Sequence, residues 1–258
     1  MLPVLFTIEE GIATITLNRP DRLNSFNRDM SLLLQQKIDE CASQNAVRCV
    51  YITGAGKAFC AGQDLAEVID PQGPGMQRIL SEHYNPIITR IRNLPKPVVA
   101  AVNGVAAGAG ANIALACDIV VAAQSVTFIQ AFSKLGLVPD SGGTYTLPRL
   151  IGWQKASALM MLGDKVPATQ AEQMGMLYKV FPDEDFAAES KKIAVTLAKL
   201  PTKGLAYTKH ILSQSMTNSL EQQLQLEDEF QQKAANTHDF KEGIQSFLEK
   251  RAPAFKGE

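Results

Sequence analysis

Residues 98–123 read VVAAVNGVAAGAGANIALACDIVVAA, and this stretch decides the fold. It is apolar enough to suggest a membrane helix, but Asn103, Asn112 and Asp118 interrupt it and several glycines break it up. Strands in the middle of a parallel sheet are apolar on both faces and produce similar runs. The stretch therefore predicts a buried strand, a glycine-rich loop, a helix and a second strand, rather than a membrane span.

Strand and helix patterns alternate on both sides of this stretch. Upstream we expect an N-terminal strand, strands over 12–17 and 47–53, a helix capped by Asn27, and another helix after a loop at 71–77. Downstream we expect a short strand near Phe128 and a helix that begins near Thr144. Helical patterns then cover 153–161, 168–174, 186–199, 203–214, 220–235 and 238–249. The order predicts an α/β core followed by a C-terminal helical region.

Composition narrows the possible partners. The 258 residues carry 25 basic and 26 acidic side chains, so the formal net charge is −1. This balance leaves no basic stripe for nucleic acid and no polybasic patch for a membrane surface. The four cysteines show no CxxC pair and lie in apolar sequence, which predicts buried, reduced thiols. The N-terminus lacks the pattern of a signal peptide, and we expect a soluble, cytoplasmic protein.

Several familiar site motifs are missing from the sequence. GAGK at 54–57 lacks the earlier glycine of a phosphate loop, and GAG at 108–110 lacks the full dinucleotide spacing. There is no GxSxG nucleophile elbow. His83, His210 and His238 are scattered without nearby metal ligands, so we expect no metal site.

Two loops and one aspartate remain. KAFCAGQDL at 57–65 and NGVAAGAGANIALACD at 103–118 each follow a predicted strand and bring small residues close to one place. Such loops leave backbone N–H groups free, and two converging N–H groups form an oxyanion hole. Tight connections in a close-packed sheet explain either loop equally well. Asp140, in GLVPDSGGT at 136–144, is either an acid/base group or the N-cap of the following helix.

Four motifs occur together in a characteristic order: NRPDRLNSFN, GKAFCAGQDL, KPVVAAVNGVAAGAGANIALACD and GLVPDSGGTYTLPRLIG. With them, essentially the whole chain resembles the crotonase (enoyl-CoA hydratase/isomerase) superfamily. The resemblance implies a ClpP-like spiral of ββα units over residues 1–195 and a helical trimerisation region over 196–258. It also implies an acyl-CoA thioester substrate, trimers or dimers of trimers, and no cofactor beyond the CoA of the substrate.

The resemblance assigns roles residue by residue. The backbone N–H groups of Gln63 and Ala109 are the implied oxyanion donors. The CoA moiety is expected along the first loop and beside the preceding turn, with cations or the C-terminal tail near its phosphates and adenine. The residues implied in binding are Arg22, Leu23, Lys57, Ala58, Ala61, Gly62, Asp64, Leu65, Gly108, Asn112, Phe132, Phe255 and Lys256. An ordinary solvated role for Arg22, Lys57 and Lys256 remains open.

Asp140 stands out against the hydratase pattern. By alignment the two glutamates of the hydratases fall at Asn112 and Phe132, neither of which can accept a proton. The sequence around Asp140 most resembles that of the ring-epoxide isomerases of phenylacetate degradation. One carboxylate suffices to remove a proton and return it elsewhere on the same enolate, so we expect isomerisation of a ring epoxide or of a 3-enoyl-CoA.

Other functions remain as alternatives. Hydration of an enoyl-CoA is the second alternative. It requires Asn112 and Asp140 together to hold and activate a water molecule. A dehalogenase with Asp140 as nucleophile is third, although the further activating groups are not identifiable. A non-catalytic member that binds CoA or RNA belongs to another class, and Asp140 and the lack of a basic surface oppose it.

Overall fold

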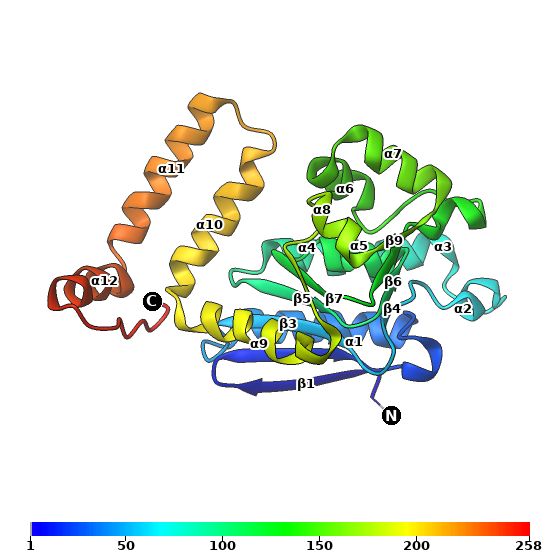
Figure 1. Cartoon of the computed structure of the whole chain (residues 1–258), viewed down its shortest axis with the longest axis horizontal. Coiled ribbons are helices and arrows are strands. Elements are labelled where there is room, and N and C mark those ends of the chain that lie inside the picture. Colours follow the sequence, from blue (N-terminus) through cyan, green and yellow to red (C-terminus); the bar gives the residue numbers. More distant parts are fainter. Residues whose placement is uncertain (1) are drawn as a thin grey trace.

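The computed structural model describes residues 2–258 and builds its core on a six-stranded sheet (Figure 1). The strands lie in the order β1-β2-β3-β5-β7-β10. β1 runs antiparallel to β2 and every other neighbouring pair is parallel. Their bounds are β1 Val4–Glu9, β2 Ile12–Leu17, β3 Cys49–Gly54, β5 Val98–Val102, β7 Ile119–Ala123 and β10 Lys179–Phe181.

A second, four-stranded sheet follows the carboxyl ends of the first. Its order is β4-β6-β8-β9, with the first two pairs parallel and the last antiparallel. The strands are β4 Ala58–Cys60, β6 Val105–Ala107, β8 Thr127–Ile129 and β9 Lys165–Pro167. Three strands of the large sheet thus each lead into a short strand of the small one: β3 into β4, β5 into β6 and β7 into β8.

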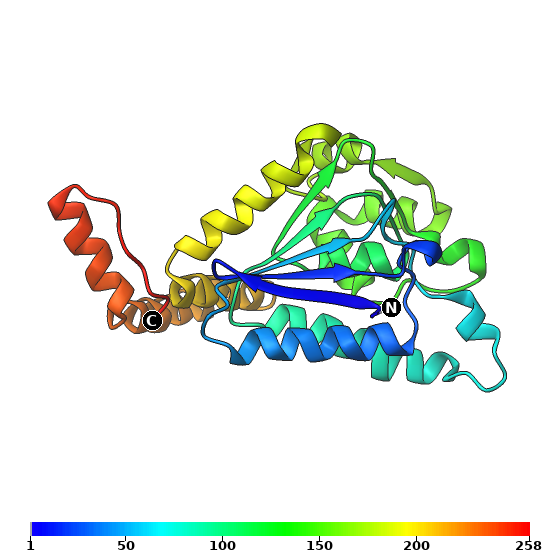
Figure 2. The same cartoon turned by 90° about the horizontal axis from the view of Figure 1, so that it is seen from below.

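The helices of the core cover both faces of the large sheet. Figure 2 shows α1 and α4 below the sheet and α9 above it, on the opposite face. Asn27 caps α1 as predicted, because its side-chain oxygen accepts a hydrogen bond from the N–H of Met30. The helices are α1 Arg28–Ser43, α2 Leu65–Ile69, α3 Gly75–Arg78, α4 Asn85–Asn93, α5 Ala109–Leu115, α6 Gly143–Ile151, α7 Trp153–Leu162, α8 Ala168–Gln173 and α9 Asp183–Lys199.

The stretch 98–123 folds as strand, loop, helix and strand, which confirms the prediction, and β6 is an additional element inside the loop. The strands β9 and β10, each three residues long, lie in a region where only helices were predicted. The predicted loop at 71–77 is shorter than expected, since α3 begins at Gly75. The helix that follows is interrupted by a π-helical segment, η2 (Ile79–Tyr84). Two short 3-10 helices complete the chain, η1 Pro20–Arg22 and η3 Ala131–Leu135.

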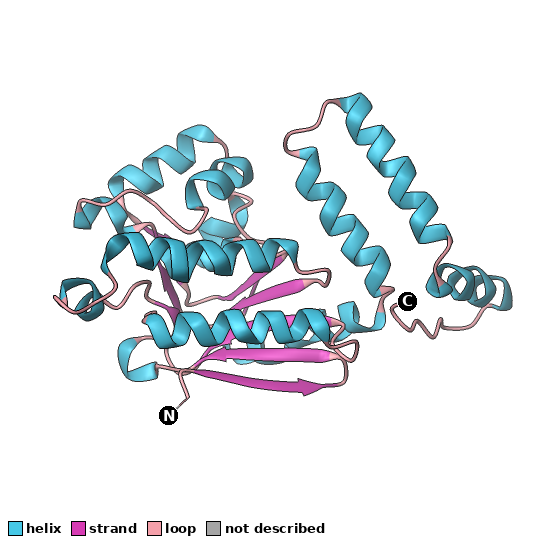
Figure 3. Ribbon diagram, turned by 180° about the vertical axis from the view of Figure 1, so that it is seen from behind, coloured by secondary structure: helices cyan, strands magenta, loops and turns pink. Residues whose placement is uncertain are grey.

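The C-terminal helices α10 (Thr202–Ser215), α11 (Leu220–Ala235) and α12 (His238–Glu249) extend away from the sheets (Figures 1 and 3). Lys209 of α10 joins this region to the core, because its buried ammonium pairs with Asp118 at 2.8 Å and donates to the carbonyl of Ile91. The predicted boundary after residue 195 falls inside α9, and the division into two domains stays a prediction.

Two further features bear on the expectations. All four cysteines are buried and free, as predicted, and burial raises the pKa of the Cys60 thiol to about 12. Among residues 2–258, no helix combines the length and apolar character needed to span a bilayer.

Candidate active site

The first loop leaves the N–H of Gln63 without an internal partner. Phe26 forms a parallel bridge with Gln63: its N–H donates to the carbonyl of Gly62 at 2.7 Å, and its carbonyl accepts from the N–H of Asp64 at 2.8 Å. These bonds flank Gln63, so its own N–H points to the opposite side. No acceptor for that N–H lies within the described part of the chain.

The second loop presents a similar group at the start of α5. Ala109 is the first residue of this helix, a position whose N–H has no intrahelical acceptor. Gly108 turns the chain there with a φ of 52°, a conformation that favours glycine. The N–H of Gly108 is held by the carbonyl of Ile129 at 2.8 Å, which fixes the loop to β8.

The two loops meet because β4 and β6 are parallel neighbours and end at the same edge. A Cβ atom built on Gly62 would lie 3.0 Å from the carbonyl oxygen of Ala107 and 3.7 Å from the nitrogen of Ala109. Gly62 also has a φ of 97°, so both close packing and conformation require glycine here. Two free N–H groups on adjoining loops can together bind one negatively charged oxygen.

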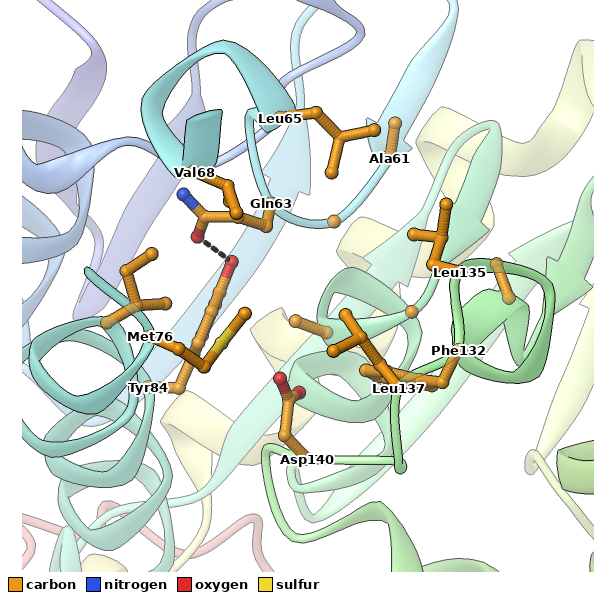
Figure 4. Close-up of a pocket in the computed structure, with 15 residues that line it drawn as sticks. Ala61, Gln63, Leu65, Val68, Met76, Tyr84, Phe132, Leu135, Leu137 and Asp140 are labelled. Carbon is orange, nitrogen blue, oxygen red and sulfur yellow. Dashed lines mark hydrogen bonds between the residues drawn. The ribbon is translucent and has the colours of Figure 1, made fainter. Parts of the chain in front are cut away.

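A pocket of about 650 Å³, part of it open to solvent, lies at this junction (Figure 4). Its walls are predominantly apolar, and Asp140 is the one carboxylate among the described lining residues. The lining comprises Ala61, Gly62, Gln63, Leu65, Val68, Met76, Ile79, Tyr84, Gly108, Ala109, Ala131, Phe132, Leu135, Leu137 and Asp140.

Asp140 points its carboxylate into the pocket (Figure 4) and does not cap a helix. The N-cap of α6 is Gly142, and no side chain provides a capping hydrogen bond there. Burial raises the pKa of Asp140, and the hydroxyl of Ser141, which donates to Oδ1 at 2.8 Å, partly opposes that rise. The carboxylate has no cationic partner within residues 2–258, so it is poised to accept a proton.

Asn112 supports this aspartate from behind. Its buried side chain donates through Nδ2 to the carbonyl of Asp140 at 2.9 Å and accepts at Oδ1 from Gln130 at 2.8 Å. Both ends of the amide are therefore occupied, and Asn112 lies outside the pocket lining. This arrangement fixes the backbone of Asp140, and the substrate contact of Asn112 expected from the sequence stays a prediction.

Comparison with known proteins agrees with this geometry. The family model described as enoyl-CoA hydratase/isomerase matches residues 7–258. The chain belongs to this family. The 1,2-epoxyphenylacetyl-CoA isomerase of Escherichia coli is 47% identical, and a probable enoyl-CoA hydratase of Rhodobacter capsulatus is 41% identical, each over 98% of both chains. The crystal structure of an enoyl-CoA hydratase from Bacillus anthracis superposes with a TM-score of 0.92 at 32% identity, covering 99% of this chain and 100% of the other.

These similarities confirm the crotonase fold. Membership of the enoyl-CoA hydratase/isomerase family indicates an enzyme that acts on acyl-CoA thioesters. Several of the site residues that were expected from the sequence line this pocket. They are Ala61, Gly62, Gln63, Leu65, Gly108, Ala109, Phe132 and Asp140.

Other expected residues lie elsewhere. Ala58 is buried within β4. Asp64 pairs with Arg19 at 2.8 Å and caps α2 through the N–H of Ala66, which occupies its carboxylate. The turn with Arg22 and Leu23 lies beside the first loop, since the carbonyl of Leu23 accepts from the N–H of Ala61. Lys57 is exposed just before β4.

The C-terminal tail does not reach the pocket of its own chain. Phe255 packs beside Gly243 of α12, and the N–H of Lys256 donates to Asp239 at 2.7 Å. In both Figure 1 and Figure 2 the C-terminus lies at the opposite end of the molecule from α2 and α3. Neither residue lines the pocket of its own chain, and the predicted contact of Phe255 and Lys256 with CoA stays a prediction.

Some lining residues were not predicted from the sequence, notably Tyr84, Met76, Leu135 and Leu137. Tyr84 belongs to a segment whose apolar periodicity indicated only a buried helical face. The π-helical geometry of η2, which sets where its ring points, has no signature in that periodicity. The sequence marked glycine and acid positions but carried no signal for these apolar walls.

The support behind Asp140 can be tested at Gly143. A Cβ on this residue would lie 2.3 Å from Nδ2 of Asn112. We expect Gly143→Ala to lower the free energy of unfolding by about 1–3 kcal/mol, because the Asn112 amide loses a bond that it makes while buried. Thermal unfolding measures this loss. Gly204→Ala in α10 is the matched control, since its Cβ would meet only Pro201, at 3.7 Å. Equal melting temperatures for the two variants would contradict the role of Asn112.

Proposed function

We propose that this chain is an acyl-CoA isomerase that moves a proton with one base, Asp140. The observation that carries the proposal is the placement of a single carboxylate, with no cation beside it, in the same apolar pocket as two free N–H groups. The N–H groups of Gln63 and Ala109 would bind the thioester oxygen. Asp140 would remove a proton from the carbon next to the carbonyl or from the conjugated position beyond it.

The reaction balances within this set of groups. As the C–H bond breaks, its electron pair becomes part of a conjugated enolate, whose negative charge resides on the thioester oxygen. One oxyanion donor stabilises such charge by about 3 kcal/mol in other enzymes. The protonated Asp140 then returns the proton to another carbon of the same enolate, so the double bond moves and no atom is gained or lost.

The structure of the pocket favours isomerisation over addition of water. Hydration needs a water to be activated and a proton to be delivered to carbon, which the hydratases achieve with two carboxylates. Phe132 occupies the position aligned with the second carboxylate, and Asn112, aligned with the first, is committed to Asp140 and Gln130. The 47% identity to a 1,2-epoxyphenylacetyl-CoA isomerase supports a cyclic acyl group, and the aromatic walls Tyr84 and Phe132 suit such a group.

Hydration is the second candidate, because the 41% identical relative is described as a probable hydratase. The protein should be incubated with a 3-enoyl-CoA and with crotonyl-CoA, and double-bond migration and hydration should be followed separately. We expect migration to be faster than hydration by at least about 10²-fold, the contribution typical of one positioned acid or base. Faster hydration would overturn the isomerase proposal in favour of the second candidate.

We also propose that the chain assembles into trimers or dimers of trimers. Exposed apolar side chains on the C-terminal helices, among them Leu220, Leu224, Phe247 and Leu248, support the expected trimer. Arg22, Lys57 and Lys256 remain candidates for contacts with the CoA phosphates.

A further inference from the structure

The pocket contains a buried tyrosine that the mechanism above does not use. Tyr84 is fully buried, its ring lines the pocket, and its hydroxyl donates to Oε1 of Gln63 at 2.7 Å (Figure 4). Burial, together with the nearby acidic groups, holds the pKa of Tyr84 well above its usual value, so the hydroxyl remains a donor. Its partner carries one of the two oxyanion N–H groups.

The side chain of Gln63 is held at both ends. While Oε1 accepts from Tyr84, Nε2 donates to Oε2 of Glu67 at 2.8 Å, and Oε1 of Glu67 accepts from the N–H of Arg28. The donors and acceptors allow only this orientation of the amide, since a tyrosine hydroxyl donates here and a carboxylate only accepts. The first loop is thereby fixed to η2, α2 and the start of α1.

Tyr84 also acts on the backbone of Gln63 through its ring. The ring packs edge-on against Phe26, with 5.9 Å between the centroids. Phe26 is the residue whose bridge turns the Gln63 N–H toward the pocket. The hydroxyl therefore holds the side chain of Gln63, and the ring supports the strand that holds its peptide group.

We propose that Tyr84 is a positioning residue that keeps the Gln63 N–H aligned with the thioester oxygen. The inference rests on the proposed function, because it assumes that this N–H stabilises an enolate. An oxyanion donor acts only when it is already aimed at the oxygen on which charge develops, so small rotations of the peptide reduce its effect. Loss of the hydroxyl should then affect the chemical step more than substrate binding.

Tyr84→Phe is the direct test, because it removes the hydroxyl and keeps the ring against Phe26. We expect kcat to fall about tenfold with KM nearly unchanged, a size typical of one hydrogen bond. Tyr51→Phe is the matched control: Tyr51 is also buried, and its hydroxyl is hydrogen-bonded to Ser190 at 2.8 Å, on β3 and outside the pocket lining. The control should lose similar stability and keep its kcat. An equal fall of kcat in both variants would overturn the proposal.

A double-mutant cycle distinguishes positioning through Gln63 from a general structural effect. Gln63→Met retains the backbone N–H and the length of the side chain but cannot accept the tyrosine's hydrogen bond. If Tyr84 acts through that bond, Tyr84→Phe should change kcat by no more than about twofold in the Gln63→Met background. A tenfold effect in both backgrounds would overturn the proposed route.

A spectroscopic readout separates this inference from the proposed function. Cinnamoyl-CoA absorbs at longer wavelength when its thioester carbonyl is polarised by hydrogen bonds. We expect a red shift on binding to the wild type and a smaller shift in Tyr84→Phe with unchanged affinity. The same shift in both proteins would overturn the positioning role alone. A wild type that fails to bind the probe, or binds it without a shift, would overturn the proposed oxyanion hole and this inference with it.

Discussion

Replacement of Asp140 by asparagine is expected to lower isomerisation by about 10³-fold, since the amide is nearly isosteric but cannot accept a proton. Asp140 is the one carboxylate among the described pocket-lining residues, so no neighbouring side chain in that lining can take over as base. Steady-state assays on a 3-enoyl-CoA measure the loss. Asp164→Asn removes the same charge from an exposed position and should retain full activity. An Asp140→Asn enzyme that isomerises at the wild-type rate would contradict the mechanism.

The same substitution should stabilise the fold at neutral pH. Burial raises the pKa of Asp140 in the folded protein above its value in the unfolded chain. A group with a raised folded pKa destabilises the folded state as the pH rises through that value, because the buried carboxyl must ionise. Asp140→Asn should therefore melt at a higher temperature than the wild type at pH 7. The difference should disappear in acid, where the wild-type carboxyl is neutral. Thermal unfolding across this pH range measures both effects.

The activity of the wild type should rise with pH over the range in which its stability falls. A general base works only when ionised, so kcat/KM should rise with pH through the raised pKa of Asp140. The pH at which the activity rises should lie above the ordinary range of an aspartate, because burial is the largest influence on this group. Stability and activity thus oppose each other at this residue.

The α/β core could be predicted because its signals are local. The apolar run 98–123 and the cap at Asn27 each determine a nearby backbone conformation, and both predictions are confirmed. The strands β9 and β10 lack such signals: three residues carry too little periodicity, and their pairing with β8 and β7 depends on distant segments. The resemblance to the family, carried by four motifs, gave the overall architecture that periodicity alone does not.

The residues of the site likewise fall into those with a local sequence signal and those without one. Glycine positions and Asp140 were recognisable because a backbone conformation or a charge marks them in the sequence. Whether Asp140 caps a helix depended on the residue at which α6 begins, and the structure places that start at Gly143, so that Gly142 is the N-cap. The hydrogen bonds of Asn112 and the position of Tyr84 arise from segments that meet only in the folded chain. Phe255 and Lys256 lie away from the pocket of their own chain, because sequence position says nothing about which end of the molecule a tail reaches, and their contact with CoA stays a prediction.

Ala109→Pro is expected to lower kcat/KM by about 10²–10³-fold, the usual effect of removing one oxyanion donor. The residue offers an unusually clean test, because a backbone N–H cannot ordinarily be removed without damage to secondary structure. Ala109 is the first residue of α5, a position where proline is well tolerated since the N–H there has no helical partner. The preceding residue is Gly108, which lacks the Cβ that would clash with the proline ring.

The control is Ala109→Ser, which keeps the N–H and should keep the activity. We expect both variants to melt within a few degrees of the wild type, so that a loss confined to proline reports the donor and not the fold. If Ala109→Pro retained wild-type activity, the thioester oxygen could not depend on this N–H. The proposed hole would then be reduced to Gln63 alone. The double variant Ala109→Pro, Tyr84→Phe tests whether both N–H groups bind one oxygen. If they do, its loss of kcat/KM should be smaller than the product of the two single losses, because groups that act on the same atom are not independent.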